Sequence, residues 1–212
     1  MTTADLPLRS VVRVPSGRSG ELPLVICLHG RGADANDLAD LAPMLDGGYR
    51  FLFPNAPHKF EPMPGYSFGW TWFDGWPPEP AAIAESRALV LQFIDAALER
   101  YPTPEGKVIL GGFSQGALMS LDCGFRTERP LAGIVSMSGA LYERELPPLK
   151  PLPVLIAHGT QDEVIPVNAA RRTRFLLEEH GLAPEYHELP MGHAVSPEEI
   201  ELVREFMARV LG

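Results

Sequence analysis

The stretch Lys107-Val-Ile-Leu-Gly-Gly-Phe-Ser-Gln-Gly116, followed by Ala117-Leu-Met-Ser-Leu121, decides the fold. An apolar run, a glycine-flanked serine and a series of helix-forming residues predict a strand, a sharp turn and a helix. Such a turn lifts the hydroxyl of Ser114 above the edge of a sheet, while Gly112 and Gly116 leave room for closely packed backbones. The pattern therefore predicts a nucleophilic serine, and the alternative is a small residue that only completes a tight turn.

An acid and a histidine follow this serine along the chain, each just past a predicted strand. The apolar run Pro153–Gly159 predicts a strand, and Asp162 lies in the loop after it. Glu185–Leu189 alternates like a last strand, and His193 lies in the loop beyond. The order serine, acid, histidine is that of the α/β-hydrolases, and open parallel sheets place their sites at the carboxyl ends of strands. We expect Ser114, Asp162 and His193 to form a catalytic triad.

Other acids and histidines are weaker candidates. Glu163 is adjacent to Asp162, but the position of the loop relative to Gly159 favours Asp162. His29 and His158 each precede a glycine at a strand end, where a histidine more often shapes a turn than acts as a base. The remaining three histidines are interpreted as surface residues: His58, His180 and His187.

Acyl transfer also needs backbone donors for the oxyanion of the tetrahedral intermediate. The amide of Gln115 follows the nucleophile and begins a helix, where amides are unpaired and the dipole favours negative charge. The turn His29-Gly-Arg-Gly32 leaves an early apolar strand and predicts the amide of Arg31 as the second donor. Because the donors are main-chain groups, both side chains are expected to be dispensable.

Along the chain, strand-like runs alternate with helical patterns, which is typical of an α/β fold with a mostly parallel, doubly wound sheet and helices on both faces. A single domain spanning residues 1–212 is expected, because a chain of this length buries about 70% of its unfolded surface. Strands are predicted near Ser10–Val14, Leu22–His29, Arg50–Pro54, Lys107–Gly111, Leu131–Met137, Pro153–His158 and Glu185–Leu189. Helices are predicted over Ala81–Tyr101, after Ser114, over Pro166–His180, and after the capping box Ser196-Pro-Glu-Glu199.

Composition and motifs limit the classes of partner and cofactor that the chain is expected to bind. The net charge of −9, spread over the chain, argues against nucleic acid and anionic membrane surfaces and favours a small neutral substrate. No basic-then-apolar leader and no apolar run long enough for a membrane span are present, so a cytoplasmic protein is expected. Cys27 and Cys123 are interpreted as buried free thiols. No zinc, phosphate-loop or dinucleotide motif is present, so no metal or organic cofactor is expected.

The chain resembles the phospholipase/carboxylesterase family of small α/β-hydrolases, which includes the acyl-protein thioesterases and has no large lid domain. The matching blocks run in order over most of the chain: Leu28–Asp34, Phe53–Pro57, Trp72–Asp74, Gly111–Gly116, His158–Pro166 and Met191–Glu199. The resemblance implies the same triad and the same two oxyanion donors. Two departures are Arg31, where thioesterase-like members usually carry leucine, and Ala117, where a second glycine often ends the turn.

An aromatic segment lies between positions 60 and 76 and holds Phe60, Tyr66, Phe68, Trp70, Trp72, Phe73 and Trp76. In the resembling family this region borders the active site, which implies that Trp70, Trp72 and Phe73 line the acyl pocket. The alternative is that the segment packs on the sheet, because aromatic side chains commonly anchor loops to a core.

These observations predict a serine carboxylesterase that acts on short to medium acyl esters. Thioesters and lysophospholipids are alternative substrates for the same triad. A binding protein on an inactive hydrolase fold is an alternative of another class. A dienelactone-type hydrolase is disfavoured, because such enzymes typically carry cysteine at the nucleophile position, where this chain has Ser114. The sequence leaves the oligomeric state open, with a homodimer as one alternative.

Overall fold

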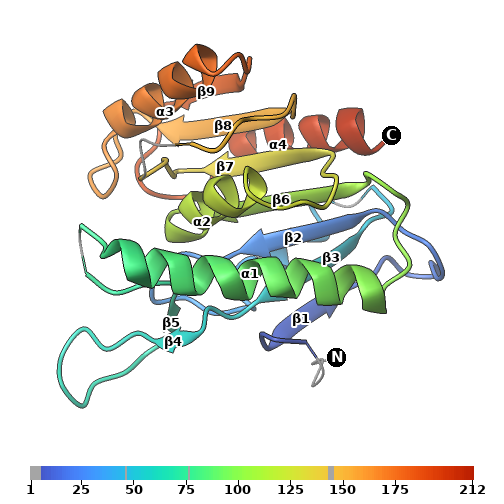
Figure 1. Cartoon of the computed structure of the whole chain (residues 1–212), viewed down its shortest axis with the longest axis horizontal. Coiled ribbons are helices and arrows are strands. Elements are labelled where there is room, and N and C mark those ends of the chain that lie inside the picture. Colours follow the sequence, from blue (N-terminus) through green and yellow to red (C-terminus); the bar gives the residue numbers. More distant parts are fainter. Residues whose placement is uncertain (1–5, 46, 76, 143–145) are drawn as a thin grey trace.

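A seven-stranded sheet forms the centre of the computed structural model, which describes residues 6–45, 47–75, 77–142 and 146–212 (Figure 1). In spatial order β1, β3, β2, β6, β7, β8, β9, the strands are Ser10–Arg13, Arg50–Pro54, Leu24–Leu28, Val108–Phe113, Gly133–Met137, Val154–Gly159 and Glu185–Leu189. The edge strand β1 pairs antiparallel with β3, and the other neighbours pair in parallel. The predicted mostly parallel sheet is confirmed.

Helices cover both faces of this sheet (Figure 1). On one face lie α1 (Pro80–Arg100), α2 (Gln115–Gly124) and α3 (Val167–Glu179), and on the other lie the short 3-10 helix η1 (Ala39–Leu41) and α4 (Pro197–Leu211). Strand β2 shows how the faces separate: Ile26 and Leu28 pack in the cluster beneath α1, whereas Val25 and Cys27 pack with α4. Because successive strand side chains point to opposite faces, a wholly apolar strand serves both layers.

The helix ends follow the local signals. Helix α1 has Pro80 at its first position, one residue before the predicted start. At α4 the hydroxyl of Ser196 accepts a hydrogen bond from the amide of Glu199 at 3.1 Å, and Pro197 begins the helix. The serine half of the predicted capping box is confirmed, because an early amide of the helix finds its partner in the cap. The reciprocal half is not present, since the side-chain oxygens of Glu199 have no hydrogen-bond partner among the described residues.

Some details differ from the sequence-based expectation. Strand β2 is shorter than predicted at both ends, and α3 starts at Val167 with Pro166 as its cap. A two-stranded hairpin of β4 (His58–Lys59) and β5 (Trp70–Thr71) was not predicted, because two-residue strands show no readable period. His58 and His187 are half-buried, not fully at the surface. Within the described part of the chain, no helix is long and apolar enough to cross a membrane.

The topology places the candidate residues at one edge. Strands β2, β6, β8 and β9 run in parallel, so the loops after their carboxyl ends meet there. Those loops carry Arg31, Ser114, Asp162 and His193.

Candidate active site

Ser114 lies in the sharp turn between β6 and α2. Its backbone angles are φ 56° and ψ −119°, which non-glycine residues rarely adopt. The glycines on either side explain how the turn fits: a Cβ added to Gly116 would lie 2.0 Å from the carbonyl oxygen of Leu28, and one added to Gly112 would lie 2.5 Å from the carbonyl carbon of Gly116. The sequence-based reason for these glycines, room for crossing backbones, is confirmed.

The structure brings Ser114, His193 and Asp162 into a continuous hydrogen-bonded chain. His193 Nε2 lies 2.8 Å from Ser114 Oγ, and His193 Nδ1 lies 2.7 Å from Asp162 Oδ2. A carboxylate only accepts, so Nδ1 carries the proton and Nε2 is left to accept from the serine hydroxyl. This is the tautomer in which a histidine can act as a base toward serine.

Asp162 is buried and firmly held, whereas the adjacent Glu163 is exposed. Its second oxygen, Oδ1, accepts hydrogen bonds from the amides of Val164 at 2.9 Å and Ile165 at 2.8 Å. Asp162 is thus the acid that reaches the imidazole, as the loop position predicted.

His158 lies behind this acid and is fully buried. Its Nε2 is 2.7 Å from the carbonyl oxygen of Ile165 and 3.4 Å from Asp162 Oδ2. A histidine in this place ties the two ends of the acid loop together, in agreement with the prediction that it shapes a turn.

The two predicted oxyanion donors lie on either side of the nucleophile. A Cβ added to Gly30 would lie 3.4 Å from the Cβ of Ser114, so the loop after β2 passes directly beside the serine. Gln115 is the first residue of α2. Among the described residues, neither the amide of Arg31 nor that of Gln115 has a hydrogen-bond acceptor.

The side chain of Gln115 holds neighbouring backbone groups, a role that corrects the expectation that this side chain is dispensable. Its Nε2 donates to the carbonyl of Phe73 at 2.8 Å, and its Oε1 accepts from the amide of Trp72 at 2.9 Å. A signal was present in α2, all of whose residues are buried, because a buried glutamine needs partners for its amide group.

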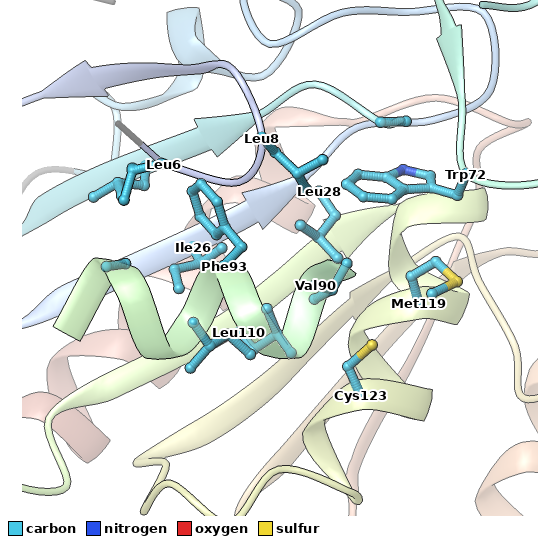
Figure 2. Packing of buried hydrophobic residues seen from close by; sticks show 14 of the residues in the cluster. Leu6, Leu8, Ile26, Leu28, Trp72, Val90, Phe93, Leu110, Met119 and Cys123 are labelled. Atoms are coloured by element: carbon cyan, nitrogen blue, oxygen red, sulfur yellow. The ribbon is translucent and has the colours of Figure 1, made fainter. Parts of the chain in front are cut away.

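The aromatic segment divides into two parts. The inner part comprises Trp72 and Phe73, whose exposed fractions are 0% and 2%, and Figure 2 draws Trp72 within the buried cluster beneath α1. The indole Nε1 of Trp72 donates to the carbonyl of His29 at 2.8 Å, and the hydroxyl of Ser86 donates to the carbonyl of Trp72. Trp72 and Phe73 therefore offer almost no surface to a substrate. This finding corrects the pocket-lining expectation for both residues in favour of packing.

The outer part of the segment reaches solvent at the β4–β5 hairpin. Met63, Tyr66 and Phe68 are 61%, 58% and 47% exposed. Trp70 is half-buried, and Lys59 Nζ lies 3.8 Å from the centre of its ring. Trp76, the last aromatic residue of the segment, lies outside the described residues.

This exposed apolar surface adjoins the oxyanion loop. A Cβ at Gly32 would meet Phe60 at 3.2 Å and Phe68 at 3.3 Å, and the guanidinium of Arg31 lies over the Phe60 ring at 5.3 Å. The side chain of Arg31 therefore points to the hairpin and leaves the backbone of its loop beside Ser114.

Both cysteines are free and buried, as predicted. Burial raises the pKa of Cys27 to about 12 and that of Cys123 well above its ordinary value. Since the thiolate is the reactive form, neither cysteine is suited to act as a nucleophile.

The sequence model of the phospholipase/carboxylesterase family matches residues 10–211. Acyl-protein thioesterase 1 of Mycosarcoma maydis is 31% identical over 92% of this chain and 94% of its own length. Acyl-protein thioesterase 1 homolog 1 of Dictyostelium discoideum is 31% identical over 78% of this chain and 79% of its own.

Solved structures of esterases are also similar to this chain. The crystal structure of esterase PE8 superposes with a TM-score of 0.84 at 27% identity and covers 97% of this chain and 99% of its own. A carboxylesterase from Mesorhizobium loti has a TM-score of 0.85 over 98% of both chains, and its 20% identity shows the common fold. The chain belongs to the phospholipase/carboxylesterase family and is thus a serine hydrolase of carboxylic ester or thioester bonds.

Proposed function

We propose that the chain is a carboxylesterase that hydrolyses short to medium acyl esters through an acyl-enzyme on Ser114. The observation that carries the proposal is the chain of contacts from Asp162 through His193 to Ser114, at 2.7 and 2.8 Å. It joins a buried acid, a base in the required tautomer and a serine hydroxyl beside a loop with an unpaired amide.

The reaction follows from these positions. His193 Nε2 takes the proton of Ser114 as the serine oxygen attacks the acyl carbonyl carbon, and Asp162 stabilises the imidazolium that forms. The amides of Arg31 and Gln115 donate to the oxygen that becomes negative. When the intermediate collapses, the carbon–oxygen bond of the ester breaks, and His193 returns the proton to the leaving alcohol. Water then repeats the sequence on the acyl-enzyme and releases the carboxylic acid.

We propose that the outer part of the aromatic segment contacts the acyl chain of the substrate. Phe68 lies close to Gly32, on the loop of the oxyanion donor, and the Tyr66 ring packs against the Phe68 ring with 5.8 Å between ring centres, while Met63 adds exposed apolar surface to the same hairpin. Acyl chains bind to apolar and aromatic surface, so a chain attached to a carbonyl at Ser114 would find its contact there.

Thioester hydrolysis at the same serine is the second candidate. It is favoured by the two relatives named acyl-protein thioesterases, which are 31% identical to this chain. Nitrophenyl esters of graded length, compared with a palmitoyl thioester and a lysophospholipid, would rank the substrates by kcat/KM.

A test of the nucleophile comes first. A fluorophosphonate probe is expected to label the wild-type chain and to leave Ser114→Ala unlabelled. Ser114→Ala and His193→Ala are each expected to lower kcat by about 10⁴-fold or more, and the double variant should be hardly worse because the triad acts as a unit. An unlabelled wild-type chain without esterase activity would favour a binding protein, and additive losses would contradict the triad.

A further inference from the structure

His29 is a buried imidazole at the end of β2 that holds two backbone groups. Its Nδ1 lies 2.7 Å from the carbonyl oxygen of Gly30, and its Nε2 lies 3.0 Å from the amide nitrogen of Ala56. The side chain is 1% exposed. It thus links the loop beside the nucleophile to the segment after β3.

These two contacts determine the position of the ring proton. The amide of Ala56 can only donate, so Nε2 must accept and carries no hydrogen. The carbonyl of Gly30 can only accept, so Nδ1 must carry the hydrogen and donate. Only the neutral Nδ1–H tautomer makes both bonds, and burial lowers the pKa of His29, which favours the neutral form.

The carbonyl that receives this hydrogen bond belongs to the peptide unit between Gly30 and Arg31. In a planar trans peptide the C=O and N–H point in opposite directions. Holding the oxygen of Gly30 therefore sets the direction of the amide of Arg31. A hydrogen bond to the carbonyl also polarises the unit and strengthens its N–H as a donor.

Neighbouring bonds restrain the loop on both sides of this peptide. Trp72 Nε1 donates to the carbonyl of His29 at 2.8 Å, and the amide of Gly32 donates to the carbonyl of Trp70 at 2.8 Å. Hydrogen bonds therefore hold both peptide planes that flank the Gly30–Arg31 peptide, the one before it at the His29 carbonyl and the one after it at the Gly32 amide. The Gly30–Arg31 plane itself is held at the Gly30 carbonyl by two bonds, a long one from the amide of Ala33 at 3.3 Å and a short one from His29 at 2.7 Å, so the bond from His29 is the stronger restraint on its rotation.

We infer that His29 is a positioning residue that orients the Arg31 amide toward the oxyanion through its Nδ1–H bond to the Gly30 carbonyl. The inference rests on the proposed function, because it needs a tetrahedral intermediate at Ser114. His29 does not touch the reacting atoms, so its contribution acts through the backbone.

A matched pair of variants separates the two bonds of His29. In His29→Asn the side-chain NH₂ can take the place of Nδ1, whereas the bond to Ala56 is lost. In His29→Gln the side-chain oxygen can take the place of Nε2, whereas the bond to Gly30 is lost. Each variant loses one hydrogen bond, so similar decreases in melting temperature are expected.

Activity should distinguish them. His29→Gln is expected to lower kcat by about 10- to 100-fold, less than the loss of a whole oxyanion donor, with a smaller change in KM. His29→Asn should keep kcat within a few-fold of wild type. Because a trifluoromethyl ketone binds as a tetrahedral oxyanion, its Ki should rise for His29→Gln in step with the loss of kcat/KM.

Equal kcat losses in the two variants, in proportion to their melting temperatures, would overturn the inference and leave the proposed function intact. A wild-type chain that neither hydrolyses esters nor reacts with a fluorophosphonate would overturn both. Should neither variant fold, ¹⁵N NMR of the wild-type imidazole decides. For the neutral ring a protonated Nδ1 and an unprotonated Nε2 are expected, and the opposite tautomer contradicts the inference.

Discussion

The two parts of the aromatic segment have similar compositions and opposite environments. Trp72 and Phe73 are buried and bound to Gln115, whereas Tyr66 and Phe68 are about half exposed on the hairpin. The difference lies in where the hydrogen-bond partners come from. The backbone at 72–73 and the Trp72 indole bond to Gln115 and His29, whereas the amides of Tyr66 and Phe68 bond to carbonyls within the segment itself. The inner part therefore supports the site, and the outer part is available to a substrate.

The largest expected effect on stability comes from the ionisation of Glu199, so variants of the inner and outer parts should be compared at one fixed pH. Burial raises the pKa of Glu199, in the first turn of α4, to about 8. In the unfolded chain this carboxyl ionises near 4.5, so the folded state loses stability as the pH rises from there to about 8. Glu199→Gln cannot ionise and should stabilise the protein by up to about 5 kcal/mol at pH 9.

At pH 5 the same substitution should change the melting temperature little, because Glu199 is then mostly neutral in the folded state. Thermal unfolding at both pH values checks the sign. A destabilisation of equal size at pH 5 and pH 9 would contradict the raised pKa.

Gln115→Ala is expected to have the next largest effect. It leaves the amide of Trp72 without a partner and removes one of the two donors to the carbonyl of Phe73, which keeps its bond from the Thr71 hydroxyl at 2.6 Å. One unsatisfied buried group and one lost hydrogen bond together cost about 2–4 kcal/mol. Activity should fall as well, since the inner part holds the oxyanion loop. Urea unfolding and kcat measure both losses, with Gln92→Ala on the exposed face of α1 as the control. Equal stability of the two variants would show that the inner part does not depend on Gln115.

Trp72→Phe tests the bond between the inner part and the oxyanion loop. It keeps an aromatic ring but removes the donor to the buried carbonyl of His29, which should cost about 1–3 kcal/mol. Trp70→Phe is the control, because Trp70 contacts Gly32 and Ala33 through its backbone. Thermal unfolding should place Trp72→Phe clearly below Trp70→Phe, and the reverse order would contradict the comparison.

The smallest effect is expected for Phe68→Ser on the outer part. KM should rise for octanoate esters and stay nearly constant for acetate, because each buried methylene contributes at most about 0.8 kcal/mol. Stability should stay within about 0.5 kcal/mol of wild type, as for most exposed positions. Phe175→Ser, at a somewhat more exposed aromatic residue on α3, is the control and should change the KM of neither ester. Equal changes for both esters would leave the hairpin without an acyl role.

Much of the fold was predictable because its signals are local. The strand and helix around Ser114, the cap at Ser196 and the apolar strands each depend on residues within a few positions of one another. The order of Ser114, Asp162 and His193 along the chain, each after a strand, also predicted their meeting at one edge. The catalytic roles of these residues remain predictions that the variants above will test.

By itself, the sequence determined the sharp turn at Ser114, the helix cap at Ser196 and the parallel α/β arrangement. Backbone sterics, capping and apolar periodicity all act over short distances along the chain. Only the tertiary structure decided which aromatic residues are buried and what the side chains of His29 and Gln115 hold. Ala56 is 27 positions from His29, and Trp72 is 43 positions from Gln115. Such pairs meet only after the order of strands brings their loops to one edge, so no local pattern could predict them.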